Sequence, residues 1–162
     1  MYQDYKDLLS AFHAHGVKYL IVGGYAVILH SQPRFTKDLD LFVKGDAVNS
    51  QAVYDALTTF GAPLQEIHPE DFADRSTFFR FGSDPRGIDI LPEIPGVDFD
   101  SAWEHRVEQV IDPASGFRAN FISADDLVAS KLAAARPQDL ADVEAIQKAA
   151  EARATAKELR QK

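Results

Sequence analysis

Three aspartates set inside apolar strands are the residues of this 162-residue chain best suited to chemistry. Asp38 and Asp40 alternate with leucines, so the two-residue period of a strand places both carboxylates on one face, roughly 7 Å apart. Aspartate is depleted in strands, and two negative charges on one face repel each other unless water or a cation screens them. Asp89, between two isoleucines, is a third such residue. A neighbouring strand could bring its carboxylate within coordination distance of the pair.

Three converging carboxylates suit hard divalent cations, above all magnesium that bridges phosphate oxygens. The alternative is that strand 37–43 lies at a sheet edge with its polar face in water, and that Asp89 merely follows a turn, because short motifs match by chance. The apolar residues between the aspartates favour the metal site, since they imply that the opposite face of each strand is buried. These apolar residues are Leu39, Leu41, Phe42, Ile88, Ile90 and Leu91.

A glycine pair, Gly23-Gly24, stands between an apolar strand and a short helix. Free backbone N–H groups and the helix dipole can hold phosphate at such a junction. A tight turn explains the two glycines equally well. The chain has neither the Gly-Lys-Ser/Thr of a P-loop nor the G-x-G-x-x-G of a dinucleotide fold, so both of those nucleotide-binding classes lack support.

Composition excludes several other classes of protein. Lys and Arg number 17 against 25 Asp and Glu, a formal net charge of −8, so no general clamp on a nucleic-acid backbone is expected. The absence of cysteine rules out disulfides, thiolate metal sites and a thiol nucleophile, and it fits a reducing cytosol. The N-terminus lacks the apolar core of a signal peptide, and no run reaches the length of a membrane span. We therefore expect a cytoplasmic protein with no membrane partner.

Hydrophobic periodicity predicts an α+β fold, a small mixed sheet with helices packed against it. The expected strands span residues 17–22, 37–43, 76–81, 87–91, 106–111 and 117–122, with an antiparallel hairpin across residues 83–86. The expected helices are one ending near Gly16, then 25–30, 48–60, a short helix around Trp103, 124–135, and one from residue 138 to near the chain end. We expect one domain overall, with residues 1–122 as a core and residues 123–162 as a C-terminal helical segment packed on it.

The two C-terminal helices have recognisable boundaries. Ser123 followed by Asp126 is a capping pattern for the first of them, and Arg136-Pro137 breaks the chain before the second. The last dozen or so residues carry few apolar anchors and are expected to be an exposed or frayed helix end. The buried stripe of the last helix is predicted to be Leu140, Val143 and Ile146.

Two blocks of sequence together resemble a known superfamily. The first is Gly23-Gly24-Tyr25-Ala26 followed by Arg34-x-Thr36-x-Asp38-x-Asp40, with Asp89 in a later strand. The second is Phe121-Ile122-Ser123-Ala124-Asp125-Asp126-Leu127, then Lys131-Leu132, Arg136 and Asp139-Leu140-Ala141-Asp142. Over roughly residues 15–147 the chain is similar to the nucleotidyltransferase superfamily typified by DNA polymerase β. Within it, the chain most resembles small bacterial proteins related to the AbiEii toxins of toxin-antitoxin systems.

The resemblance implies a nucleotidyltransferase-like mixed β-sheet flanked by helices, with a C-terminal helical pair. It also implies transfer of a nucleoside monophosphate from an NTP, such as ATP, to an acceptor hydroxyl, with release of pyrophosphate. Asp38 and Asp40 would hold two Mg²⁺ or Mn²⁺ ions, and Asp89 would complete the second site and could accept the acceptor's proton. Gly23, Gly24 and the amide of Tyr25 would cradle the phosphates, at a position where many superfamily members carry Gly-Ser.

Further polar residues are candidates for phosphate contact. Arg34 and Thr36 could touch phosphate and steady the aspartate strand, or be a solvated loop guanidinium and an ordinary strand threonine. Lys131 could reach the β- and γ-phosphates, as the resemblance implies, or be a surface lysine. Arg136, Asp139 and Asp142 could orient Lys131 or join the two helices in a network. Alternatively, the two aspartates are helix-start charges that complement the dipole.

Acceptor and partners remain open at the level of sequence. Candidate acceptors are a tRNA end or other RNA, a protein side chain and a small molecule, and an antitoxin protein is a candidate partner. One rival reading is a non-catalytic nucleotide- or metal-binding regulatory module with the same fold. Another is an interaction protein whose C-terminal helix docks a second chain.

Overall fold

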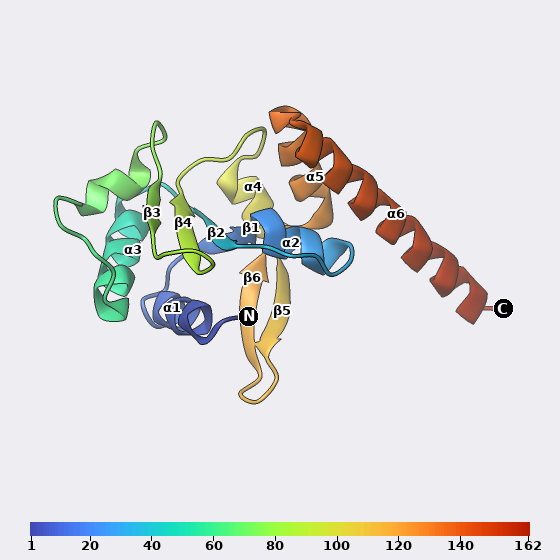
Figure 1. Cartoon of the computed structure of the whole chain (residues 1–162), viewed down its shortest axis with the longest axis horizontal. Helices are drawn as coiled ribbons and strands as arrows, with labels where there is room; N and C mark the ends of the chain where they lie inside the picture. Colours follow the sequence, from blue (N-terminus) through green and yellow to red (C-terminus); the bar gives the residue numbers. More distant parts are fainter.

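The computed structural model describes residues 1–162 as a six-stranded mixed sheet flanked by helices (Figure 1). The strands lie in the order β3-β4-β2-β1-β6-β5. They are β1 (Tyr19–Val22), β2 (Asp38–Val43), β3 (Phe79–Phe81), β4 (Gly87–Leu91), β5 (Val107–Asp112) and β6 (Phe117–Phe121). The helices are α1 (Gln3–Ala14), α2 (Gly23–His30), α3 (Ala47–Phe60), the 3-10 helix η1 (Pro69–Ala73), α4 (Phe99–Glu104), α5 (Ala124–Ala134) and α6 (Pro137–Arg160). The chain is therefore an α+β protein with a C-terminal helical pair, as the sequence predicts.

Local sequence signals account for the helix ends. The Asp46 side chain accepts a hydrogen bond from the Asn49 N–H at the start of α3, and Gly61 ends that helix with φ 93°. Ser123 accepts from the Asp126 N–H at the start of α5, which confirms the predicted cap. These caps set the first residues of α3 and α5 and the last residue of α3.

Strand β2 lies in the interior of the sheet, so the alternative of an edge strand is wrong. It pairs in parallel with β4 and antiparallel with β1. The hairpin of β3 and β4 forms as predicted, with Arg80 opposite Asp89. Because β2 and β4 pair in parallel, the two aspartate-bearing strands start at the same end of the sheet.

One continuous hydrophobic core joins the sheet to both C-terminal helices, with Leu127 of α5 and Ile146 of α6 among its members. The predicted buried stripe of α6 is partly wrong. Val143 and Ile146 are buried, but Leu140 is 48% exposed. Asp139 and Asp142 are buried next to that stripe, because they face Lys131 of α5 and form ion pairs with its ammonium group.

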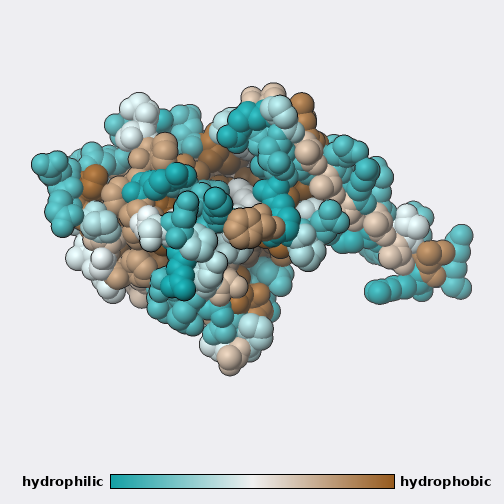
Figure 2. Space-filling model, in the orientation of Figure 1, coloured by the Kyte–Doolittle hydropathy of each residue, from teal (hydrophilic) through white to brown (hydrophobic).

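The second half of α6 extends beyond the body of the protein (Figure 1). Arg153 Nη2 donates a hydrogen bond to the His30 carbonyl at 3.3 Å, and residues 150–162 are all exposed. The exposure of this end is as predicted, although the helix continues to Arg160. Its surface is mostly hydrophilic, with a small hydrophobic spot near the tip (Figure 2). None of the helices has both the length and the apolar character needed to cross a membrane.

Candidate active site

A single row across the sheet brings two of the predicted site residues, Asp40 and Asp89, together. In this row Arg80 of β3 lies opposite Asp89 of β4, Asp89 lies opposite Asp40 of β2, and Asp40 lies opposite Val22 of β1. Neighbouring strands are about 4.8 Å apart, so side chains in such a row contact one another when they leave the same face. Sequence reasoning placed Asp38 and Asp40 on one face, and both line the same cleft with Asp89.

Glycines give the carboxylates the space they occupy. A Cβ added to Gly23 would come within 1.9 Å of Asp40 Oδ2, and one added to Gly87 would come within 2.4 Å of Asp38 Oδ1. Gly23 also has φ +64°, a conformation that side chains other than hydrogen rarely adopt. The first glycine of the Gly-Gly pair is therefore required by the packing of Asp40 as well as by the turn.

The cleft at the carboxylates consists of two hollows that share lining residues, with volumes of about 340 Å³ and about 310 Å³, each within the range of roughly 300–1,000 Å³ found for small-molecule sites. One half of the cleft is mixed in character, with walls from the loop after β4 and from α5. It is lined by Leu91, Ile94, Pro95, Leu127, Ser130 and Ala134. The other half carries no hydrophobic side chain and is lined by Gly24, Arg34, Thr36, Lys37, Gln138 and Asp142. Gly23, Asp38, Asp40, Lys131, Arg136 and Asp139 line both halves.

The two halves differ in the chemistry they offer. The wholly polar half suits phosphate groups, because it has four cationic side chains: Arg34 and Lys37 of the α2–β2 loop, Lys131 of α5, and Arg136 at the N-cap of α6. The half that contains leucine, isoleucine and proline side chains suits the less polar part of a ligand. Asp38 and Asp40 lie where the two halves meet.

Crowding of negative charge is evident in the ionisation of Asp40. Burial, then contact with the Asp89 carboxyl and the nearby charge of Asp38, raises the pKa of Asp40 to about 7, while Arg80 acts in the opposite direction. The carboxylate of Asp89 in turn raises the pKa of the Arg80 guanidinium, which donates one hydrogen bond to each of its two oxygens. The proton that Asp40 tends to keep and the Arg80 guanidinium thus offset part of the negative charge of the three aspartates.

Asp38, Asp40 and Asp89 offer the ligand atoms that a divalent cation prefers, because their carboxylate oxygens come together from two paired strands. The side chains are not placed as a finished metal centre, since no group of three or more acidic or histidine side chains is close enough to enclose one ion. Both oxygens of Asp89 are engaged by Arg80, at 2.6 Å from Nε and 2.8 Å from Nη2. The arrangement is that of a carboxylate cluster whose charge one arginine partly neutralises.

The start of α2 lies at the same cleft. Val22, its N-cap, supplies no side-chain hydrogen bond, so the first N–H groups of the helix lack a partner within it. Gly23 and Gly24 line the cleft there. Tyr25 supplies its amide to this first turn, but its ring packs edge-on against Tyr5 at 5.9 Å and does not line the cleft.

Arg34 and Thr36 both line the polar half of the cleft. The Thr36 hydroxyl packs so closely on Gly24 that an added Cβ there would come within 2.3 Å of Oγ1. Arg34 Nη1 donates to Asp142 Oδ1, and its other amino nitrogen lies beside Gly24. The loop before β2 is thereby joined to α6, and neither residue is a detached surface group.

Lys131 is held in a buried ionic network. Its ammonium nitrogen lies 3.2 Å from Asp139 Oδ1 and 2.9 Å from Asp142 Oδ2, and its side chain is only 12% exposed. Arg136 Nε donates to Asp139 at 2.7 Å, and this contact, more than that of Lys131, lowers the pKa of Asp139. These contacts bear out the predicted network. Asp139 is also a helix-start charge, because its carboxylate accepts a hydrogen bond from the Arg136 backbone N–H at 3.2 Å in the first turn of α6.

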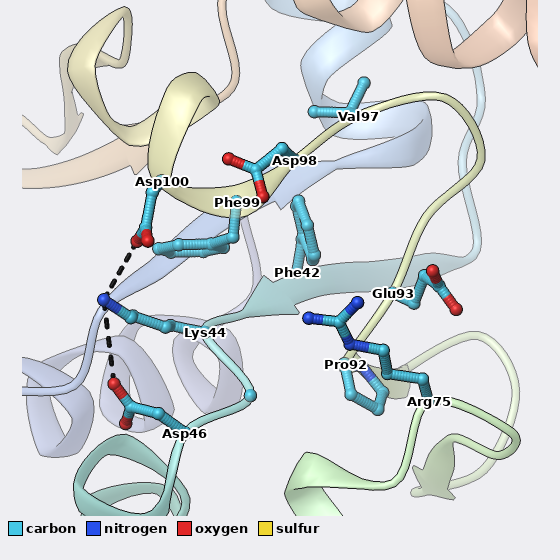
Figure 3. A pocket seen from close by; sticks show the side chains of 11 residues that line it. Phe42, Lys44, Asp46, Arg75, Pro92, Glu93, Val97, Asp98, Phe99 and Asp100 are labelled. Carbon is cyan, nitrogen blue, oxygen red and sulfur yellow. Dashed lines mark ion pairs between the residues drawn. The ribbon is translucent and has the colours of Figure 1, made fainter.

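A second, smaller hollow of about 160 Å³ lies at the opposite end of β2. Its Lys44 is held between Asp100 at 2.9 Å and Asp46 at 3.6 Å (Figure 3). The hollow has no glycine-rich helix start, and this lysine is already paired with two of its acidic side chains. It offers no comparable place for a phosphate chain.

Two residues of the site were missed by sequence reasoning. Arg80 lies between Phe79 and Phe81, and the strand period places it on the face opposite the phenylalanines, where the aspartates point. Gly87 was treated only as the start of a strand, although its missing side chain makes room for Asp38. The alternation around Arg80, combined with the predicted hairpin, was the signal that could have found it.

A helix-flanked mixed sheet that gathers aspartates from two paired strands beside a glycine-rich helix start defines a nucleotidyltransferase-like protein. The chain belongs to a family described as nucleotidyltransferase of unknown function (DUF6036), whose model matches residues 3–152. No curated protein matches the chain. The family match confirms the superfamily that the two sequence blocks indicated.

Proposed function

We propose that the protein transfers a nucleoside monophosphate from an NTP to an acceptor hydroxyl. The observation that carries the proposal is the row in which Asp40 and Asp89 lie opposite each other, with Asp38 beside them, inside the cleft. Family membership supports the same class of reaction. The unpartnered N–H groups at the start of α2 support phosphate binding in that cleft.

The reaction forms one bond and breaks one bond. The acceptor oxygen attacks the α-phosphorus, the bond from that phosphorus to the pyrophosphate oxygen breaks, and the acceptor hydroxyl loses its proton. Divalent ions, Mg²⁺ or Mn²⁺, would supply charge stabilisation on the triphosphate and on the attacking oxygen. Asp38, Asp40 and Asp89 would hold these ions, and Asp89 is the candidate to receive the proton once its oxygens are free of Arg80.

The remaining cleft residues would bind and orient the triphosphate. Gly23, Gly24 and the amide of Tyr25 offer N–H donors at the start of α2. Arg34 and Lys131 bring positive charge from the loop before β2 and from α5, each held in place by Asp142. Thr36 packs against Gly24 and supports the loop that carries Arg34.

The finer assignment is to the branch related to AbiEii toxins, in which the chain acts as a component of a toxin-antitoxin system. The ionic network of Lys131, Arg136, Asp139 and Asp142 supports it, because these are the residues of the second resembling block. The acceptor is then a tRNA end, with a protein side chain or a small molecule as the other candidates. The cationic side chains of the cleft offer a local site for such a substrate on an acidic protein of net charge −8.

A second candidate function is a non-catalytic nucleotide- or metal-binding module. Two observations favour it: both oxygens of Asp89 are bound by Arg80, and Lys131 is paired with two carboxylates. A protein of this kind would bind a nucleotide in the cleft without turnover.

The deciding experiment incubates the protein with each of the four NTPs, labelled at the α-phosphorus, together with Mg²⁺ and total RNA or cell lysate. Labelled macromolecular or small-molecule product is expected with the parent protein and not with Asp38→Ala or Asp40→Ala. An NTP labelled at the γ-phosphorus should transfer no label, because pyrophosphate is the leaving group.

Asp125→Asn is the matched control, because Asp125 is exposed, makes no ion pair and does not line the cleft. Its transfer rate should equal that of the parent. Label transfer that survives Asp40→Ala would contradict the site assignment. Nucleotide binding without transfer under every condition would favour the non-catalytic module.

A further inference from the structure

Arg80 occupies the place at which a cation would meet Asp89. Its guanidinium donates two hydrogen bonds to the Asp89 carboxylate, from Nε at 2.6 Å and from Nη2 at 2.8 Å, and Nη2 also lies 3.7 Å from Asp38 Oδ2. A guanidinium in this two-pronged geometry engages both oxygens of a carboxylate at once. The same oxygens are those that the proposed function assigns to a divalent ion.

The two side chains of the Arg80–Asp89 ion pair differ greatly in their exposure to solvent. The side chain of Asp89 is 7% exposed, whereas that of Arg80 is 59% exposed. Arg80 stands on β3, a three-residue strand at the edge of the sheet, so no further strand covers it. The arginine can therefore turn into solvent, while the carboxylate cannot leave the cleft.

Arg80 and a divalent ion would neutralise the same negative charge. Asp38, Asp40 and Asp89 carry more negative charge than one guanidinium neutralises, and without any cation a nearly buried Asp89 would be unpaired. A divalent ion neutralises the cluster more fully, but it needs the carboxylate oxygens that Arg80 holds. A divalent ion and the guanidinium therefore oppose each other's binding at Asp89.

We propose that Arg80 is a positioning residue that holds Asp89 in the cation-free protein and competes with a divalent ion for that carboxylate. This inference rests on the proposed function, because it assumes an ion site at these aspartates. Asp38 and Asp40 then bind a first ion more tightly than the site that includes Asp89, and that second site fills only when Arg80 turns outward. The Arg80–Asp89 ion pair thus keeps the Asp89 carboxylate neutralised, and the protein folded, when divalent ions are scarce.

The test is a titration of the full chain with Mn²⁺ alone, followed by electron paramagnetic resonance of the free ion and by calorimetry. Arg80→Gln should bind the second Mn²⁺ about tenfold or more tightly than the parent, since a charge-assisted pair no longer has to be broken. Arg80→Lys, which keeps the charge but not the fork, should fall between them. The rise in Tm on adding Mn²⁺ should be larger for Arg80→Gln than for the parent.

Two controls separate competition from a structural effect. Arg86→Gln removes another exposed arginine, one that lies 3.5 Å from Asp4 away from the cleft, and should leave Mn²⁺ affinity unchanged. Adding Asp89→Asn to Arg80→Gln should abolish the gain. Equal Mn²⁺ affinity in the parent and Arg80→Gln, or a weaker one in the variant, would overturn the competition and leave the proposed function intact. No Mn²⁺ bound by any variant would overturn both.

Discussion

Asp40 and Asp89 lie directly opposite each other on the parallel strands β2 and β4, and the pKa of Asp40 is raised to about 7. Burial is the larger cause, and the neighbouring carboxyl adds to it. Asp40 therefore keeps its proton up to about pH 7 in the folded protein without a divalent ion, whereas the unfolded chain would release it. This relationship makes stability depend on pH in a defined direction.

In the absence of divalent ions, the free energy of unfolding should fall as pH rises from about 4 to about 7. The folded state keeps a proton on Asp40 over this window and the unfolded state, with the ordinary pKa of 3.8, does not, so the slope is negative. Asp40→Asn should therefore gain on the parent by up to about 1.4 kcal/mol per pH unit across the window. Urea unfolding in chelator at several pH values measures the difference. A difference that does not change with pH, or one no larger than that of Asp125→Asn, contradicts the crowding of carboxylates.

Gly23→Ala should destabilise the protein by about 2–4 kcal/mol, because the new methyl group combines backbone strain with overpacking. The Cβ would stand 1.9 Å from Asp40 Oδ2 at a residue with φ +64°. Gly16→Ala is the matched control, since Gly16 has φ +67° and nothing within 4 Å of an added Cβ. It should lose only about 1 kcal/mol. Equal losses in thermal or urea unfolding would show that Asp40 does not pack on Gly23.

Lys131→Met should cost about 2–4 kcal/mol of stability, because it leaves Asp139 and Asp142 buried with one arginine each. It should also weaken NTP binding by removing a positive charge from the polar half of the cleft. Lys148→Met removes an exposed lysine that pairs with Glu144 at 2.8 Å and should leave both properties unchanged. Unfolding curves and nucleotide titrations measure the two effects. A Lys131→Met protein as stable as Lys148→Met would contradict the network.

Tyr5→Phe should lower both stability and transfer activity, because the Tyr5 hydroxyl lies at the starts of the two aspartate-bearing strands. It donates to the Gly87 carbonyl at 2.9 Å and lies 3.1 Å from the Lys37 carbonyl. Loss of this buried hydrogen bond should cost about 1 kcal/mol, and the looser strand starts should lower kcat more than they raise KM. Tyr2→Phe removes a neighbouring hydroxyl that makes no such bond and serves as the control. An active and fully stable Tyr5→Phe would exclude this role.

Much of the fold follows from local patterns in the sequence. The alternation at Asp38 and Asp40, the cap at Ser123 and the break before Pro137 each depend on a few adjacent residues, so the strand and helices they predict are the ones that form. Register across the sheet depends on pairing between distant segments, which periodicity alone does not specify. The meeting of Asp40 and Asp89 was therefore a hypothesis until the strands were seen side by side.

The three aspartates of the site could be predicted from the sequence, but the arginine that pairs with Asp89 could not. An aspartate inside a strand stands out, whereas Arg80 reads as one more surface arginine until its opposite neighbour is known. Leu140 shows the converse error, because its helical spacing predicts burial while the ion pairs of Asp139 and Asp142 take the inward face of α6. Charged groups that bury one another cannot be recognised from hydrophobic periodicity.

The central claim is that Asp38, Asp40 and Asp89 hold divalent ions for nucleotidyl transfer. The most direct measurement follows α-labelled NTP into product as Mg²⁺ is added to the parent, Asp40→Asn and Asp125→Asn. The account predicts label in product for the parent and Asp125→Asn, dependence on the divalent ion, and no label for Asp40→Asn. Transfer by Asp40→Asn at the parent's rate, or transfer by the parent in the presence of excess chelator, would contradict it.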